Sequence, residues 1–136
     1  MATKARGFVD AYHQSRLNHV TGTAYPTALT GTWIGLYLGS LPVSDGTGTT
    51  DTVRAAVTLD NQAQDPNTNR WYIQPTAAVT LTPTASGEAV GWGVYGASTG
   101  GTPVYFDTLP NPIPVKGGVA ITLPATTFRV WAEGTL

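Results

Sequence analysis

The side chains that could carry acid, base or metal chemistry are few in this sequence. Its 136 residues include 2 histidines, 8 acidic residues and no cysteine. His13 and His19 lie six residues apart in a stretch expected to be helical, and this spacing does not put two imidazoles on the same helix face. Without a thiolate, a third histidine or a His-Glu-x-x-His pattern, a zinc site has little to be built from. We therefore expect both histidines to be surface or interface residues.

Carboxylates offer two further arrangements. The Asp-Gly-Thr-Gly sequence at residues 45–48, together with Asp51, could supply oxygen ligands to calcium, but the spacing does not match an EF-hand and Asp-Gly is a common turn former. Glu88 and Asp107 could form a glycosidase pair if a hairpin brought them together. Neither arrangement is specific, so we expect no cofactor, no metal site and no catalytic centre, that is, a protein that is not an enzyme.

Glycines and aromatic residues favour packing or binding over catalysis. Gly91, Gly93 and Gly96 form a loose G-x-G-x-x-G, but they fall within an expected strand and do not open a helix. They predict a smooth groove in which a large side chain or another backbone lies close. Exposed aromatic rings could also stack on a sugar, although their alternation with apolar residues fits burial in a core. The candidates for such stacking are Trp71, Tyr72 and Trp92.

Composition excludes several kinds of partner. Charged residues make up only 11% of the chain, well below the roughly 25% of an ordinary soluble domain, and the net charge is -1 with no block of like charge. This balance argues against a nucleic-acid partner and against an anionic membrane surface. No apolar stretch approaches the roughly 18 residues of a membrane span, and no signal peptide is recognisable. We expect a protein without disulfides that is made in cytoplasm.

Hydrophobic periodicity predicts one helix at the N-terminus. Phe8, Tyr12 and Leu17 recur at near-helical spacing within residues 5–18. A helix of about fourteen residues is marginal in isolation. We therefore expect Phe8 and Tyr12 to dock on a β-core or on another subunit.

The rest of the chain predicts strands separated by turn signals. The expected strands cover residues 32–39, 53–59, 71–73, 77–82, 88–96, 104–106, 119–123 and 128–131. The first is apolar on both faces and should be central. A polar excursion at 60–70 and a rigid proline-rich segment at 109–114 interrupt the pattern. The prediction is an all-β single domain, an antiparallel β-sandwich of 7–8 short strands (31–136) with one N-terminal α-helix in a helical arm (1–30).

The order of these elements resembles a known group of proteins. A short helix, Trp-Ile-Gly-Leu-Tyr-Leu at 33–38 and a Gly-Thr-rich loop are followed by Gly-Trp-Gly-Val-Tyr-Gly-Ala-Ser-Thr-Gly-Gly at 91–101 and Val-Lys-Gly-Gly at 115–118. This order is similar to that of small tailed-bacteriophage virion proteins of the head decoration, head-fibre, tail-fibre and minor tail types. The resemblance covers residues 8–123. It implies a β-sandwich structural subunit of the virion, made in the host bacterial cytoplasm, with no catalytic residue to carry over.

Three functions remain open on the sequence. The first is a capsid decoration or cement protein that binds the major capsid protein or other virion proteins as a homo-oligomer, a trimer or ring, and stabilises the head through area and multivalency. The second is a tail, collar or neck component, and the third is a carbohydrate-binding module of a receptor-binding fibre. Some residues could form the assembly interface, although each could equally serve the core. They are Phe8, Tyr12, Pro110, Pro112, Ile113 and Pro114.

Overall fold

The computed structural model describes residues 7–22, 29–43, 45–47 and 52–132 of the chain. Within this part the elements are β1 (Gly7–Phe8), α1 (Asp10–Val20), β2 (Trp33–Leu38), β3 (Ala55–Ala56), β4 (Ala63–Gln64), β5 (Trp71–Ile73), β6 (Val79–Leu81), β7 (Gly87–Tyr95), β8 (Tyr105–Val115), β9 (Ile121–Leu123), the 3₁₀-helix η1 (Ala125–Phe128) and β10 (Val130–Trp131). The paired strands run antiparallel. The expected all-β fold with one α-helix is confirmed, with ten strands in the described residues and a strand β8 that is much longer than expected.

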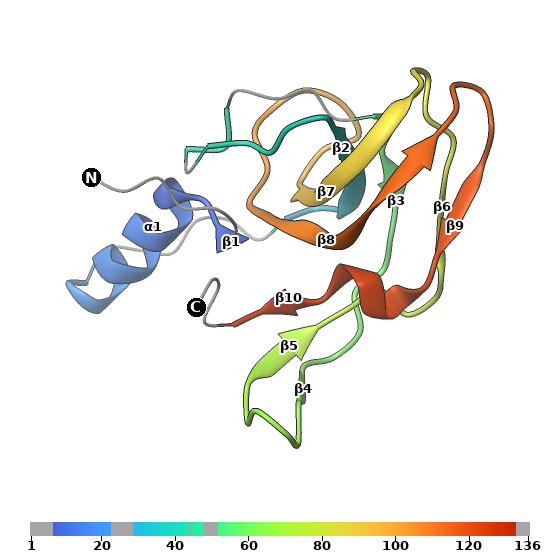
Figure 1. Ribbon diagram of the computed structural model, residues 1–136. Helices are drawn as coiled ribbons and strands as arrows, with labels where there is room; N and C mark the ends of the chain where they lie inside the picture. The colour runs from blue at the N-terminus through green and yellow to red at the C-terminus, as the bar shows by residue number, and fades with distance from the viewer. Residues whose placement is uncertain (1–6, 23–28, 44, 48–51, 133–136) are drawn as a thin grey trace.

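The described strands form three sheets (Figure 1). The largest sheet has the order β1-β8-β7-β2-β3, and two smaller sheets have the orders β10-β5-β4 and β6-β9. The long strands β7 and β8 form a hairpin whose connection contains Gly100 and Gly101, both with positive φ. Only glycine adopts this backbone conformation without strain, so the turn expected at residues 98–101 is confirmed.

The inner face of the large sheet packs on both smaller sheets and on η1. Trp92 of β7 lies near the middle, with its ring centroid 5.3 Å from Phe128 and 5.7 Å from Tyr105. Side chains from all three sheets surround it. The buried members of this cluster are Ile34, Leu36, Val79, Leu81, Ala89, Trp92, Val94, Tyr105, Leu109, Val115, Leu123, Phe128 and Val130.

The outer face of the large sheet is covered as well. A second buried cluster contains Val9, Tyr37, Tyr95 and Phe106, and the Tyr95 hydroxyl donates to the Tyr37 hydroxyl at 3.0 Å. Strand β2 therefore contributes buried side chains to both faces and lies between β7 and β3. The expectation that this strand is central and covered on each side is confirmed.

The N-terminal helix begins later than expected. Gly7 and Phe8 pair with Phe106 and Tyr105 of β8, and Val9 is in extended conformation at the start of α1. The prediction of helix for Gly7 to Val9 is wrong because these residues bond to a sheet edge, where the Val9 N–H reaches the Val104 carbonyl at 3.2 Å. The helix runs on to Val20, two residues past its expected end, while residues 5 and 6 lie outside the described part.

The proline-rich segment is part of a strand. The prediction that it interrupts the strand pattern is therefore wrong. Residues 109–114 belong to β8, where Pro110, Pro112 and Pro114 are exposed and Leu109 and Val115 are buried. Their register against β7 shifts between Ala89 and Gly91, which marks a bulge. In the described residues no strand pairs with β8 on its other side beyond Phe106. Because proline has no N–H to donate, an edge strand with a bulge accommodates it.

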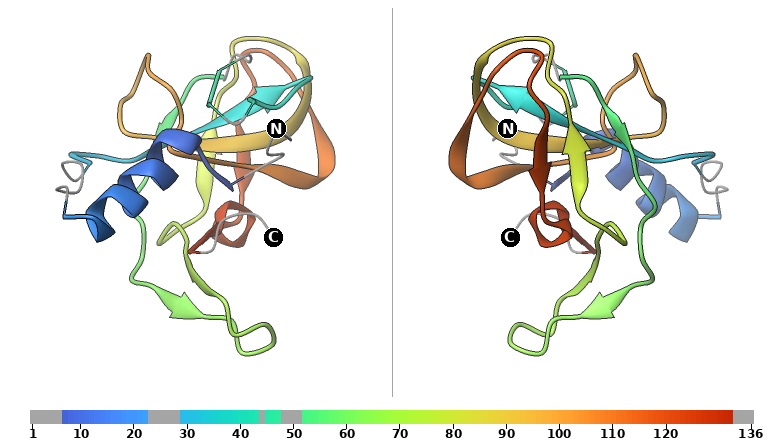
Figure 2. Two further views of the ribbon diagram at one scale, coloured as in Figure 1. Left: turned by 90° about the vertical axis from the view of Figure 1, so that its left-hand side faces the viewer. Right: turned by 90° about the vertical axis from the view of Figure 1, so that its right-hand side faces the viewer.

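The polar excursion at residues 60–70 contains a strand that the sequence did not indicate. Strand β4 pairs with β5, and the hairpin between them projects from the body in both views of Figure 2. The expected Asp-Pro-Asn turn is confirmed, since the Asp65 carboxylate accepts the Asn67 N–H at 2.8 Å and Asn69 has a φ of 58°. The neighbouring prediction of a strand at 53–59 is only partly right, because the ladder there is reduced to β3 and one bridge from Leu59 to Pro75.

Arg54 connects the β7–β8 loop to the edge of the large sheet. Its guanidinium lies 3.4 Å from the Tyr95 ring centroid and donates to the Ala97 and Gly100 carbonyls at 2.9 and 2.8 Å. We expect Arg54→Ala to lower the free energy of unfolding by about 1–2 kcal/mol, since a cation–π contact and two partly exposed charge-assisted hydrogen bonds are lost. Chemical denaturation would measure this. Arg54→Lys keeps the charge but not the planar fork, so recovery of full stability in the lysine variant would contradict the assignment.

Candidate functional site

The histidines lie on α1, as expected. His13 is half-buried with its ring 6.0 Å from Phe8 in an edge-to-face arrangement, and His19 is exposed in the last helical turn. Among the residues that the structure describes, no three His, Asp or Glu side chains are grouped so that they could hold a metal ion. The histidines are therefore positioned as surface residues of the helix.

Asp45 has a local role in its loop. Its carboxylate accepts hydrogen bonds from the Thr47 hydroxyl at 2.7 Å and the Thr47 N–H at 2.9 Å, and these bonds hold the pKa of Asp45 below its usual value. Gly46 between them has a φ of 84°, which fits a turn. The Asp-Gly turn is thus present, while Gly48 and Asp51 of the calcium hypothesis lie outside the described residues.

The two carboxylates of the glycosidase hypothesis are not brought together. Glu88 lies opposite Pro114, and Asp107 lies opposite Trp92, four residues further along β7. At about 3.3 Å per residue this separation is about 13 Å along the strand, beyond the roughly 5–9.5 Å that such pairs span. The loose glycine motif is also structural, because it lies in β7 and its end, and Gly93 faces the Tyr37 ring.

The three aromatic residues proposed for sugar stacking have different environments. Trp92 is only 1% exposed, so its candidacy is wrong and its alternation with apolar neighbours correctly indicated a core residue. Tyr72 is half-buried, with the Arg129 guanidinium 4.2 Å from its ring centroid. Trp71 is 47% exposed. Trp71 is therefore the candidate with the most accessible ring.

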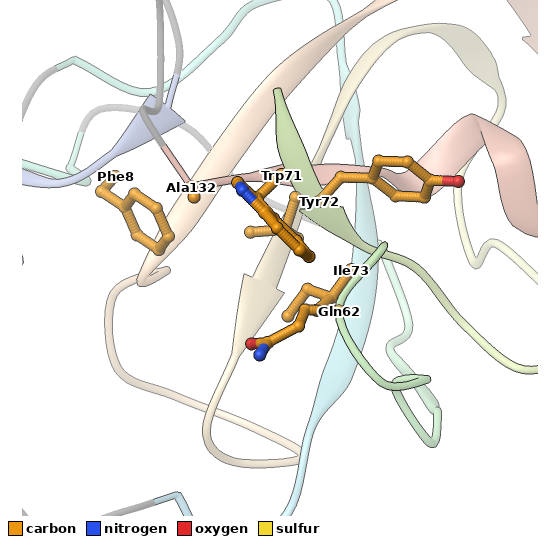
Figure 3. Close-up of a pocket in the computed structure, with 7 residues that line it drawn as sticks. Phe8, Gln62, Trp71, Tyr72, Ile73 and Ala132 are labelled. Atoms are coloured by element: carbon orange, nitrogen blue, oxygen red, sulfur yellow. The ribbon is translucent and has the colours of Figure 1, made fainter. Parts of the chain in front are cut away.

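An apolar pocket of about 370 Å³ lies beside Trp71 (Figure 3). It is formed where the small β10-β5-β4 sheet meets β1, and Figure 3 shows Phe8 and Trp71 on opposite sides of it, with Gln62 near Ile73. Its lining suits an apolar side chain more than a polar molecule. The lining residues are Phe8, Gln62, Trp71, Tyr72, Ile73, Val130 and Ala132.

Helix α1 stands next to this pocket but contributes no buried side chain. It is connected to the body by the stack of Tyr12 on Phe8 at 4.7 Å and by a bond from Arg16 to the Ala132 carbonyl at 3.4 Å. Leu17 is 69% exposed and Val20 is 84% exposed. Figures 1 and 2 show the helix projecting from one side of the β-body. In the described part of the chain no helix is long and apolar enough to cross a membrane.

We call the apolar residues of this region the arm surface. It consists of the half-buried Phe8 and the exposed Tyr12, Leu17, Val20 and Trp71. The sequence indicated Phe8 and Tyr12 as interface residues, but it did not indicate Leu17, Val20 or Trp71 for this role. The available signal for Leu17 and Val20 was their spacing of three residues, which places both on one face of the helix.

The residues expected in an assembly interface fall into two groups. Phe8 is half-buried and packs edge-to-face on Tyr105 at 4.9 Å, with Tyr12 stacked on it. Ile113 packs against the core, while the three prolines of β8 are exposed. The structure separates the groups, because Phe8 lies opposite Tyr105 at the start of β8 and Pro114 lies near its end, opposite Glu88. Of these interface candidates only Phe8 lines the apolar pocket.

Comparison with known proteins adds one finding to this geometry. No curated protein and no solved structure matches the chain significantly. The family model described as Podophage GP4 fiber I protein gp80 matches residues 7–130, which include β1 to β9 and the first residue of β10. This agrees with the resemblance to tailed-phage virion proteins. The chain belongs to the Podophage GP4 fiber I protein gp80 family, a family of virion structural proteins.

Proposed function

We propose that the chain is a structural subunit of a fibre on the tailed-phage virion, and that the arm surface holds it to a neighbouring virion protein. The observation that carries this proposal is helix α1, which projects from the β-body with no buried side chain. The fibre in the family description supports the same reading. Its mechanism is binding, without a reaction.

The physical argument starts from the cost of an isolated helix. An 11-residue helix is marginal in water, because nucleation is unfavourable and most helical stability in proteins comes from packing. Here the helix contacts the body through the rings of Tyr12 and His13, which lie against Phe8, and through one bond from Arg16, and it buries no side chain. A partner that covers Leu17 and Val20 and fills the pocket beside Trp71 would supply the missing burial.

Capsid decoration remains the second reading. A cement protein on the head and a fibre subunit both act through repeated contacts in a ring or trimer, so the same arm surface serves either. We prefer the fibre assignment to capsid decoration because the family description names a fibre protein. In both readings the protein is made in the host cytoplasm and resides in the virion with other virion proteins as partners.

We expect Val20→Ser to weaken attachment to the virion at least tenfold, because it removes an apolar contact at the tip of the arm surface. Particles lacking the subunit, grown from a phage with an amber codon in its gene, are mixed with purified protein and sedimented. The wild-type chain should bind saturably at a fixed copy number. Valine and serine have similar helix propensities, so the helix itself should persist. Val119→Ser is the matched control, since Val119 is 52% exposed in the β8–β9 turn and should leave binding unchanged.

The same particles test the location. Gold-labelled antibody on reconstituted virions should mark fibres. Label over the head shell would contradict the fibre assignment and support capsid decoration. No binding of the wild-type chain, or equal binding by the Val20 and Val119 variants, would contradict attachment through the arm surface.

A further inference from the structure

We propose that a second pocket, on the side of the body formed by β8, η1 and β10, binds a neutral pyranose of a host-surface polysaccharide. The pocket has a volume of about 430 Å³ and is open to solvent. This proposal rests on the proposed function, because a fibre subunit meets the host surface. Its lining includes Asp107, Thr108, Thr126, Thr127, Arg129 and Trp131, with Pro110 among its walls.

The lining offers the groups that a polyhydroxylated ring requires. Each sugar hydroxyl both donates and accepts, so its site needs donors and acceptors side by side. Arg129 donates, Asp107 accepts, and the threonine hydroxyls do both. The indole of Trp131 and the ring of Pro110 supply apolar surface for the C–H groups of the sugar. The pocket beside Trp71 has fewer polar groups and no charged side chain in its lining, since only Gln62, Trp71 and Tyr72 of that lining carry polar side-chain atoms.

The polar groups are held in place before any ligand arrives. The Arg129 Nε donates to the Gln74 Oε1 at 3.0 Å, and the guanidinium lies 4.2 Å from the Tyr72 ring centroid. These contacts use the Nε and one face of the guanidinium, and the terminal nitrogens of Arg129 carry further N–H donors. The Asp107 Oδ1 accepts the Thr108 N–H at 2.7 Å, which orients the carboxylate. A rigid site loses less conformational entropy on binding, so a weak ligand gains affinity.

The charges favour a neutral ligand. Arg129 and Asp107 line the same pocket and offset each other, so an anionic chain would meet the carboxylate and a cation would meet the guanidinium. A neutral hydroxylated ring can use both groups as hydrogen-bonding partners. The site therefore fits a neutral sugar better than an acidic peptide or an acidic polysaccharide.

Two-dimensional NMR of the nitrogen-labelled full chain tests the proposal. Glucose, galactose, mannose, rhamnose and N-acetylglucosamine are titrated singly to about 50 mM, a range suited to the millimolar affinity of single sugars. We expect at least one of them to shift the Trp131 indole and Arg129 Nε–H signals while the Trp71 indole stays unchanged. Arg129→Lys retains the charge but loses the planar fork, and it should weaken binding at least tenfold with a well-dispersed spectrum. Gln62→Ala, in the other pocket, should bind as the wild type does.

Several outcomes would overturn the proposal. They are shifts at Trp71 in place of Trp131, equal binding by Arg129→Lys, no shift with any of the five sugars, or shifts induced only by poly-glutamate or galacturonate. The titration uses the chain in solution and does not depend on particle attachment. Val20→Ser should leave the sugar shifts intact, so failure of the sugar site and failure of the fibre assignment are distinguishable.

Discussion

Trp92→Ala is expected to lower the free energy of unfolding by about 3–5 kcal/mol, the usual cost of removing a large aromatic side chain from a core. The indole is 1% exposed and contacts Phe128 and Tyr105, which come from η1 and the neighbouring strand β8. Its removal leaves a cavity between the large sheet and the smaller ones. The measurement is guanidinium denaturation followed by circular dichroism, which does not depend on the lost fluorophore.

Trp71→Ala is the matched control for this change. Trp71 is 47% exposed, so the same substitution should alter the free energy of unfolding by about 1 kcal/mol or less. Since small domains have a total stability of about 5–15 kcal/mol, Trp92→Ala could leave too little for folding. In that case Trp92→Phe is used instead. Its loss in free energy of unfolding should be smaller than that of Trp92→Ala but still larger than that of Trp71→Ala. Equal losses at positions 92 and 71 would contradict the placement of Trp92 in the core.

The pattern of the sequence was sufficient where a strand is covered on both faces. The apolar run at 33–38 predicted a central strand, and β2 lies between β7 and β3 with side chains in both buried clusters. The alternation of glycines with Val90, Trp92 and Val94 likewise predicted a strand with one large-residue face and one open face. These features can be read locally, because side chains two residues apart in a strand point to the same face.

Pairing between distant segments could not be read in the same way. Phe8 has an apolar neighbourhood compatible with a helix, yet it pairs with Tyr105, almost a hundred residues later. The prolines of β8 argue against a strand unless one knows that their side of the strand is an edge. Both facts depend on where other segments dock. The wrong helix start and the misread proline segment have this common cause.

The candidate sites were predicted even less completely. Phe8 and Tyr12 were proposed as interface residues because they are large and fall in the segment predicted as a short helix, although Phe8 lies in β1. The sugar pocket joins Asp107 of β8 to Arg129 and Trp131 near the end of the described chain. The sequence indicated Asp107 only as a partner of Glu88, which the hairpin register separates from it. No local motif links residues that come together only through packing of η1 and β10 beside β8.

Gly93→Ala is expected to lower the free energy of unfolding by about 3 kcal/mol, the upper end for overpacking a core. An added Cβ would overlap the Tyr37 hydroxyl and lie 2.7 Å from the Tyr37 Cζ. The tyrosine cannot move aside easily, because its ring is buried in the cluster on the outer face of the large sheet and its hydroxyl is bonded to that of Tyr95. The expected loss would lower the thermal midpoint by about 10 °C in a calorimetric scan.

Gly87→Ala in the same strand is not expected to lower the free energy of unfolding. A Cβ there would meet Leu38 at ordinary van der Waals distances, 3.7 Å from Cδ1 and 3.9 Å from Cβ. Since alanine also restricts the unfolded chain, stability should stay level or rise by up to about 1 kcal/mol. Tyr37→Phe removes the overlapping hydroxyl, so in the Gly93→Ala background it should recover part of the loss, although alone it costs about 1 kcal/mol. The expected coupling between the two substitutions is about 1 kcal/mol or more. Additive losses would show that the hydroxyl is not what the alanine displaces, and the groove formed by the glycines of β7 would then need another occupant.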